Sequence, residues 1–196
     1  SLSADPIAQG ALAGAFALIL FAAAWHKLSE PLMFEAALDA YRLLPSGFAA
    51  PASRALPIIE AAIGVALVVP ASRQPALIAF ALLMALYAAA MAINLLRGRA
   101  QIDCGCGADV HLLSWALVAR NGVLALAALL ICRPDSARQI DWLDGVSLIA
   151  GVLGLYMIYL LFDELLRQHG RIAHLRRQPQ TQHLRAKQHG LPGSAS

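Results

Sequence analysis

The sequence predicts an all-α protein, a polytopic membrane helical bundle with about five transmembrane helices. Hydrophobic residues make up 59% of the 196-residue chain and charged residues only 14%, and the mean hydropathy is +0.63. Soluble domains lie nearer about 45–50% apolar and about 25% charged. The apolar residues also occur in blocks, which is the pattern that a bilayer requires. The net charge of +3 is small and reflects mainly the C-terminal tail, so it gives little support to nucleic-acid binding.

Each apolar block has about the length, near 20 residues, that crosses about 30 Å of hydrocarbon. The block that contains Glu60 is the weakest, because Pro57 and Pro70 bracket it. We expect Pro57 in the first turn, where its missing N–H costs little, and Pro70 at the stop. Gly10 and Gly14 form a small-xxx-small pair that lets helices approach closely. The bundle is expected to cover residues 1–166, followed by a polar, basic and partly disordered tail, 167–196. The predicted spans are residues 7–25, 56–72, 75–96, 112–132 and 145–162.

The segment between the first two spans predicts a short amphipathic helix that lies in the membrane interface. Its charged residues Glu35, Asp39 and Arg42 fall on one side, and Pro45 is expected to end it. The apolar side recurs at helical spacing and consists of Met33, Phe34, Ala37, Leu38, Tyr41 and Leu44.

Polar residues within or beside the spans converge on one half of the predicted bundle. With five spans, the first loop, the third loop and the tail lie on one side of the membrane. Charges inside hydrocarbon are costly and normally pair, so we predict an ion pair between Glu60 and Arg120. Two interpretations stay open, a structural clamp and a polar pocket beneath the third loop. The converging residues are His26, Lys27, Glu60, Asn94, Arg120 and Asn121.

Two cysteines, Cys104 and Cys106, flank Gly105 in the third loop, after Asp103 and just before the fourth span. A Cys-x-Cys disulfide closes a very small ring, and strained disulfides are easily reduced. A helix N-terminus close by would lower the pKa of a thiol from about 8.5. The residues therefore predict a redox-active pair with Cys104 and Cys106 as the catalytic residues.

Two other interpretations of the motif remain. The pair could bind a soft metal ion, as in a metal-handling membrane protein, with His111 as a further ligand. Both cysteines could instead be inert, as in a non-catalytic membrane scaffold that docks a partner through the amphipathic segment and the tail. The third cysteine, Cys132, follows Cys106 by 26 residues, or roughly 39 Å along a helix axis. It is therefore expected at the opposite end of the fourth span and not as the resolving thiol.

Two stretches resemble the MauE family, within the DoxX-like redox-associated membrane proteins. One runs from His26 to Leu67, HKLSEPLMFEAALDAYRLLPSGFAAPASRALPIIEAAIGVAL, and contains Lys27 and Glu60. The other is DCGC at 103–106, followed by LSWALVARN, which ends at Arg120-Asn121. The family motif commonly continues Cys-Gly-Cys-Phe-Gly, whereas Gly107 and Ala108 follow here.

The resemblance implies a four-helix-bundle core like those of DoxX and the vitamin K epoxide reductases. It implies a thiol–disulfide relay that helps to mature the disulfide-rich small subunit of methylamine dehydrogenase, with a thioredoxin-like partner of the MauD type. In that relay Cys104 and Cys106 react, and Asp103, Gly105, Lys27, Glu60, Arg120 and Asn121 support them. The similarity to vitamin K epoxide reductases also suggests a quinone as electron acceptor. Their second, loop-borne cysteine pair is missing here, and a separate thioredoxin-like partner would supply it.

The expected location is the bacterial inner (cytoplasmic) membrane, with the cysteine face in the periplasm. Exported disulfide chemistry requires that face. Basic residues argue against it, because eleven Lys and Arg residues lie on the cysteine side and three on the other. By the positive-inside rule, the cysteine side would face the cytoplasm.

Overall fold

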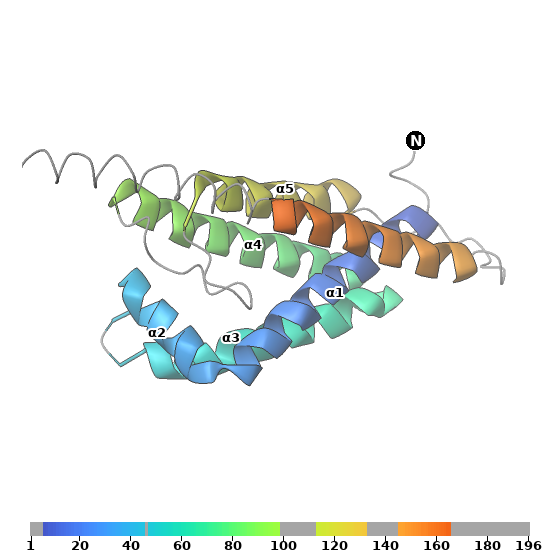
Figure 1. Cartoon of the computed structure of the whole chain (residues 1–196). Coiled ribbons are helices and arrows are strands. Elements are labelled where there is room, and N and C mark those ends of the chain that lie inside the picture. The colour runs from blue at the N-terminus through green and yellow to red at the C-terminus, as the bar shows by residue number, and fades with distance from the viewer. Residues whose placement is uncertain (1–5, 46, 99–112, 133–144, 166–196) are drawn as a thin grey trace, which may run out of the picture.

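The computed structural model describes residues 6–45, 47–98, 113–132 and 145–165, and all regular structure within these ranges is helical (Figure 1). Four of the helices are long and apolar enough to cross a membrane, and the fifth apolar helix is shorter, with 17 residues. The predicted all-α membrane bundle is therefore confirmed. The helices are α1 (Pro6–Ser29), α2 (Pro31–Tyr41), α3 (Ala49–Val68), the short 3-10 helix η2 (Pro70–Ser72), α4 (Arg73–Leu96), α5 (Trp115–Ile131) and a last helix, Gly145–Leu165.

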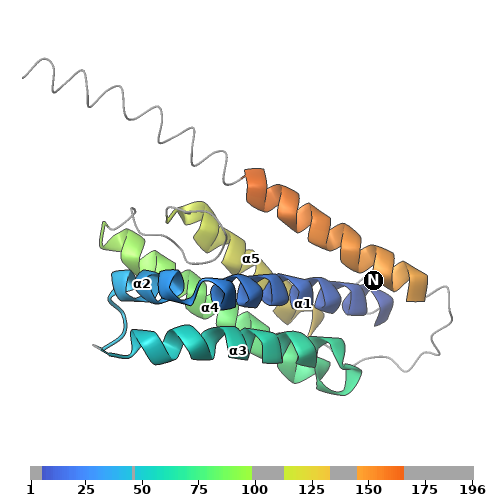
Figure 2. The same ribbon diagram turned by 60° about the horizontal axis from the view of Figure 1, so that its bottom comes forward.

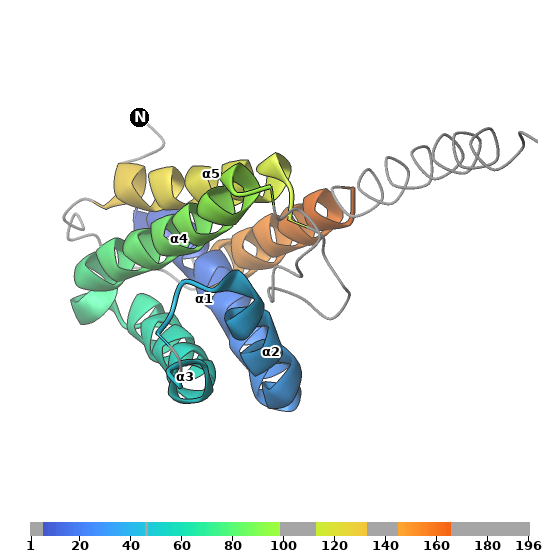
Figure 3. The same cartoon turned by 90° about the vertical axis from the view of Figure 1, so that its left-hand side faces the viewer.

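The helices form two antiparallel pairs, α1 with α3 and α4 with α5, and the pairs pack on each other (Figures 2 and 3). The helix Gly145–Leu165 lies against α1. The short helix α2 lies at one end of the bundle, where α1 and α4 finish and α3 and α5 begin. This end, called the α2 end below, faces the viewer in Figure 3.

Two helix boundaries differ from the prediction in ways that matter for the site. α1 continues to Ser29 instead of ending near residue 25, so Lys27 is a buried helical residue and not a loop charge. α3 begins at Ala49 instead of near residue 56, which places Pro57 inside the helix and Pro51 in its first turn. Hydropathy detects where apolar residues stop, whereas helical hydrogen bonding continues through polar ends. Both helices are therefore longer at the α2 end than their apolar blocks.

The predicted amphipathic helix is present as α2. Its residues Phe34 and Tyr41 are buried, whereas Met33 is exposed. The helix ends before Pro45, because Arg42 adopts a left-handed conformation (φ 48°) and its N–H donates to the Asp39 carbonyl at 3.1 Å. A left-handed cap residue satisfies a terminal carbonyl and stops the helix without a proline.

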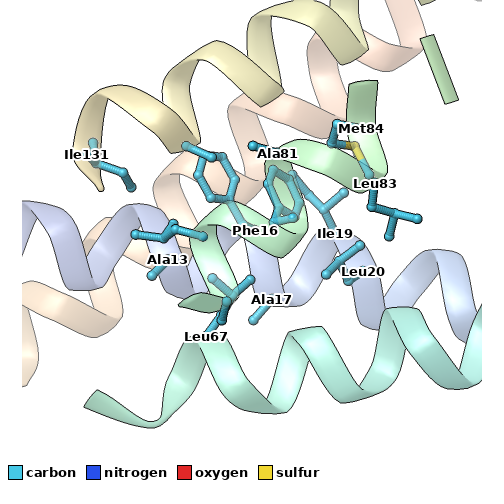
Figure 4. Close-up of a cluster of buried hydrophobic side chains, with 14 residues drawn as sticks. Ala13, Phe16, Ala17, Ile19, Leu20, Leu67, Ala81, Leu83, Met84 and Ile131 are labelled. Atoms are coloured by element: carbon cyan, nitrogen blue, oxygen red, sulfur yellow. The ribbon is translucent and has the colours of Figure 1, made fainter. Parts of the chain in front are cut away.

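The main apolar core lies toward the opposite end from α2 (Figure 4). Phe16 of α1 stacks on Phe80 of α4, with ring centroids 4.5 Å apart and an interplanar angle of 14°. Leu20, Leu67 and Leu77 are completely buried around them. Because lipid is as apolar as these side chains, close packing is what favours helix contact over lipid contact here.

Glycines allow the helix Gly145–Leu165 to approach α1. A Cβ atom added to Gly14 would lie 2.6 Å from Val152 Cγ2, and one added to Gly10 would lie 2.8 Å from Leu148 Cδ1. Real Cβ atoms do not come this close to their neighbours, so only glycine fits without movement. The close approach predicted for Gly10 and Gly14 is confirmed, and the last helix is the partner.

Candidate functional site

The predicted reactive residues fall in segment 99–112, outside the described residues. This applies to Asp103, Cys104, Gly105 and Cys106, and to His111, the further ligand of the metal interpretation. The two flanks of the segment are described. Gly98 follows α4, and Leu113 precedes α5, both at the α2 end. The described residues on both sides of the cysteine segment therefore lie at that end of the bundle.

The start of α5 weakens one argument for a reactive thiolate. α5 begins at Trp115, and Ser114 is its N-cap, whose side chain accepts from the Leu117 N–H at 3.4 Å. Eight positions therefore separate Cys106 from the cap residue, whereas the effect of a helix dipole falls off within the first turn. Cys106 is therefore too far along the sequence from the start of α5 for the helix N-terminus to be counted, by sequence proximity alone, as a cause of a lowered thiol pKa.

A small apolar cluster closes the bundle at the flank of this segment. Tyr41, Met91, Leu113 and Leu117 are all buried and pack together, which joins α2, α4 and α5. Tyr87 packs against the same cluster from one turn further inside α4. Leu113, the first described residue after the cysteine segment, is thus buried in the protein interior.

A buried ion pair lies deeper in the same half of the bundle. The Lys27 ammonium of α1 donates to Glu60 Oε1 of α3, and their side chains are 4% and 0% exposed. The Tyr87 hydroxyl donates to the same oxygen at 2.7 Å. Lys27 Nζ also lies 4.8 Å from the Tyr87 ring centroid and 5.1 Å from that of Phe34, within the range of cation–π attraction. Helices α1, α2, α3 and α4 all contribute to this charge cluster.

The predicted pair between Glu60 and Arg120 is wrong. Arg120 of α5 pairs instead with Asp163 of the helix Gly145–Leu165, and both side chains are 9% exposed. The Arg120 guanidinium also lies 5.9 Å from the Tyr159 ring centroid. Glu60 cannot reach Arg120 because α3 packs against α1, which presents Lys27 to it.

Several buried polar atoms in this half have no hydrogen-bond partner among the described residues. Glu60 Oε2 is one, since both donors go to Oε1. The Asn94 amide donates to the Ala90 carbonyl at 3.1 Å, but no described residue donates to its Oδ1. Asn121 is only 3% exposed, and its Nδ2 has no acceptor among the residues that the structure describes. The predicted convergence of polar residues on this half is confirmed for these positions.

Sequence reasoning missed Tyr87 and Asp163. Tyr87 lies seven residues before Asn94 and therefore on the same face of α4, which was a usable signal. Asp163 directly follows the apolar block that was predicted to end at residue 162, so it was assigned to the polar region outside the membrane. At the other end of α5, Cys132 is the cap residue, as predicted, and its Sγ lies 3.6 Å from the Gln74 carbonyl oxygen.

Comparison with known proteins gives a consistent match. The family model of the methylamine utilisation protein MauE matches residues 6–133, which include α1 to α5 and the cysteine segment. The MauE protein of Paracoccus denitrificans is 43% identical over 129 residues, covering 65% of this chain and 69% of that protein. The MauE protein of Methylorubrum extorquens is 39% identical and covers 65% of this chain and 70% of its own length. That of Paracoccus versutus is also 39% identical and covers 64% of this chain and 68% of its own length. No solved structure matches. The chain belongs to the MauE family of methylamine utilisation proteins.

Proposed function

We propose that this membrane protein is a thiol–disulfide relay that helps to mature the small subunit of methylamine dehydrogenase, together with a thioredoxin-like partner of the MauD type. The Cys104-Gly105-Cys106 motif carries the proposal, because two thiols separated by one residue can close and open a strained disulfide. Membership of the MauE family supports it by linking the chain to methylamine utilisation.

The proposed exchange proceeds in two substitutions at sulfur. The thiolate of one motif cysteine attacks the partner's disulfide, which forms a mixed disulfide and releases one partner thiolate. The second motif cysteine, after losing its proton, then attacks the first. This closes the Cys104–Cys106 disulfide and releases the partner's second thiolate. The motif is oxidised and the partner reduced by two electrons, and the reverse sequence oxidises the partner. The relative reduction potentials set the direction.

The face and the electron acceptor are part of the same proposal. We place the cysteines on the periplasmic side of the inner membrane, where exported proteins acquire disulfides. Lys27 is buried within α1 and so does not count among the loop charges that oppose this orientation. For the direction that oxidises the partner and reduces the motif, a quinone is the proposed electron acceptor. It takes two electrons and two protons when the motif dithiol becomes a disulfide.

Trapping of the mixed disulfide tests the relay. Replacing the resolving cysteine leaves the attacking one bound to the partner, so either Cys104→Ser or Cys106→Ser should accumulate a covalent complex. The measurement is a reductant-sensitive band that contains both proteins after acid quenching and alkylation. Cys132→Ser is the matched control, because that thiol lies at the opposite end of α5 and should leave trapping unchanged.

Labelling of intact cells with a membrane-impermeant thiol reagent tests the proposed face. We expect Cys104 and Cys106 to react when Cys132 is replaced by Ser.

The relay is contradicted if neither Cys104→Ser nor Cys106→Ser traps a partner and both variants retain full maturation of the small subunit. One equivalent of Cu(I) or Zn(II) bound in a cysteine-dependent manner would favour metal handling instead.

A further inference from the structure

Several buried polar atoms point to a ligand in the half of the bundle that contains the α2 end, called the α2 half below. These atoms have no hydrogen-bond partner among the described residues. Glu60 is completely buried, and its Oε2 receives no hydrogen bond from the described residues. Asn94 is also completely buried, and no donor in the described part of the chain reaches its Oδ1. The Asn121 side chain is nearly as deeply buried, and its Nδ2 has no acceptor within the same ranges. Removing such groups from water without replacing the lost hydrogen bond is costly, so almost every buried polar group in a folded protein has a partner.

The helix pattern brings these atoms to one region. Tyr87 and Asn94 are seven residues apart on one face of α4, and Leu117 and Asn121 are four apart on one face of α5. These faces meet, because Met91 and Leu117 belong to the same buried cluster. The two helices run antiparallel. One turn deeper than Met91 is Tyr87, and one turn deeper than Leu117 is Asn121, so Tyr87 and Asn121 lie at about the same level.

Tyr87 connects this level to the carboxylate. Its hydroxyl donates to Glu60 Oε1 at 2.7 Å, so the carboxylate lies within reach of the interface between α4 and α5. Asn94 lies nearly two turns from Tyr87 in the direction of the α2 end. The unpartnered atoms of Glu60 and Asn121 thus lie near the level of Tyr87, and that of Asn94 lies closer to the α2 end.

The ligand must both donate and accept hydrogen bonds. Two of the atoms, Glu60 Oε2 and Asn94 Oδ1, are acceptors, and Asn121 Nδ2 is a donor. Water meets both needs, and a buried water typically bonds to about three otherwise unsatisfied polar groups. We infer that bound water occupies the α2 half of the bundle at Glu60, Asn94 and Asn121. This inference does not depend on the thiol–disulfide relay.

Bound water changes what the charge cluster can do. A dry pair of Lys27 and Glu60 would be a clamp between α1 and α3. With water on Glu60 Oε2, the carboxylate has a hydrogen-bond donor in addition to Lys27 and Tyr87. The polar half of the bundle is then a hydrated site, which corresponds to the pocket of the two predicted interpretations.

Side-chain amide exchange in the full chain tests this directly. In the ¹⁵N-labelled protein in lipid nanodiscs, the Asn94 and Asn121 amide protons should give cross-peaks to water. Gln9 is the matched control, because this buried amide, at the other end of the bundle, donates to the Ile131 carbonyl at 2.8 Å. The amide protons of Asn121 should exchange roughly tenfold faster than those of Gln9, the ratio expected for one missing protein hydrogen bond. Equal protection at all three residues would overturn the inference.

A stability measurement separates water from an empty space. If Asn121 donates to water, Asn121→Leu removes a satisfied hydrogen bond and lowers the melting temperature. If Asn121 is truly without a partner, the same change removes a desolvated amide and raises the melting temperature, which would refute the proposal. A lowered melting temperature together with strong exchange protection would mean that a protein group outside the described ranges bonds to Asn121, and this too would refute it.

Discussion

The two halves of the bundle are held together by different forces. Away from α2, the helices meet through stacked rings and completely buried aliphatic side chains, with Phe16 and Phe80 at the centre. Toward α2, they meet through Lys27, Glu60 and Tyr87, together with buried asparagines. One half resembles an ordinary apolar core, and the other contains charges that a bilayer penalises.

The difference shows how helices select neighbours where the solvent is lipid. Apolar surface by itself does not distinguish a protein contact from a lipid contact, so the apolar half gains from packing but carries little information about pairing. Ion pairs and close glycine contacts, in contrast, determine which helices lie side by side. Lys27 specifies that α3 lies beside α1, while Gly10 and Gly14 specify where the last helix lies.

The largest expected effect comes from breaking the charge pair in the polar half. Glu60→Leu leaves the Lys27 ammonium buried without its carboxylate, and we expect a loss of about 3–5 kcal/mol in the free energy of unfolding. The double variant Lys27→Met with Glu60→Leu should recover most of this loss, because no charge is then left unpaired. Reversible unfolding in mixed micelles measures both. Additive losses in the double variant would mean that the two side chains are not coupled.

A smaller effect is expected from a cavity in the apolar half. Phe80→Ala removes a completely buried ring that stacks on Phe16, which should lower the free energy of unfolding by about 3 kcal/mol. The matched control is Leu82→Ala in the same helix, where the side chain is 67% exposed and the change should be close to neutral. The same micelle assay applies. Equal losses in both variants would contradict the position of the core.

The smallest of the three effects concerns the glycine contact. Gly14→Val places a Cβ 2.6 Å from Val152 Cγ2 and should destabilise the protein by about 2 kcal/mol through overpacking against the last helix. Gly122→Val is the control, since no atom of the described ranges lies within 4 Å of its added Cβ. Melting temperatures compare them. If the control loses as much as Gly14→Val, docking of the last helix does not explain the loss.

Most of the fold was predictable from the sequence, because bilayer thickness imposes blocks of fixed length on any chain that crosses it. The ends of the helices were not. Hydropathy falls at Trp25 and rises again only near residue 56, yet α1 continues through Lys27 and α3 starts at Ala49. Backbone hydrogen bonds do not depend on side-chain polarity, so polar residues at the α2 end are helical without being apolar.

Most residues of the polar site were predictable from the sequence, but the ion pairs that they form were not. Composition alone places Glu60 and Arg120 inside spans, but either could pair with any opposite charge at a similar depth. The choice depends on which helix faces which, a property of packing that one sequence does not encode in an obvious pattern. Asp163 was overlooked because it directly follows the last apolar block, whereas Lys27 was named among the converging residues but not as the partner of Glu60.

The two ion pairs impose an order on membrane insertion. Glu60 follows Lys27 by 33 residues, so the charges of α1 and α3 neutralise each other early as the chain is made from its N-terminus. Arg120 precedes Asp163 by 43 residues, and it meets this partner only after the last helix has been synthesised. Synthesis of the helix Gly145–Leu165 therefore supplies the carboxylate that pairs with this guanidinium in the finished bundle.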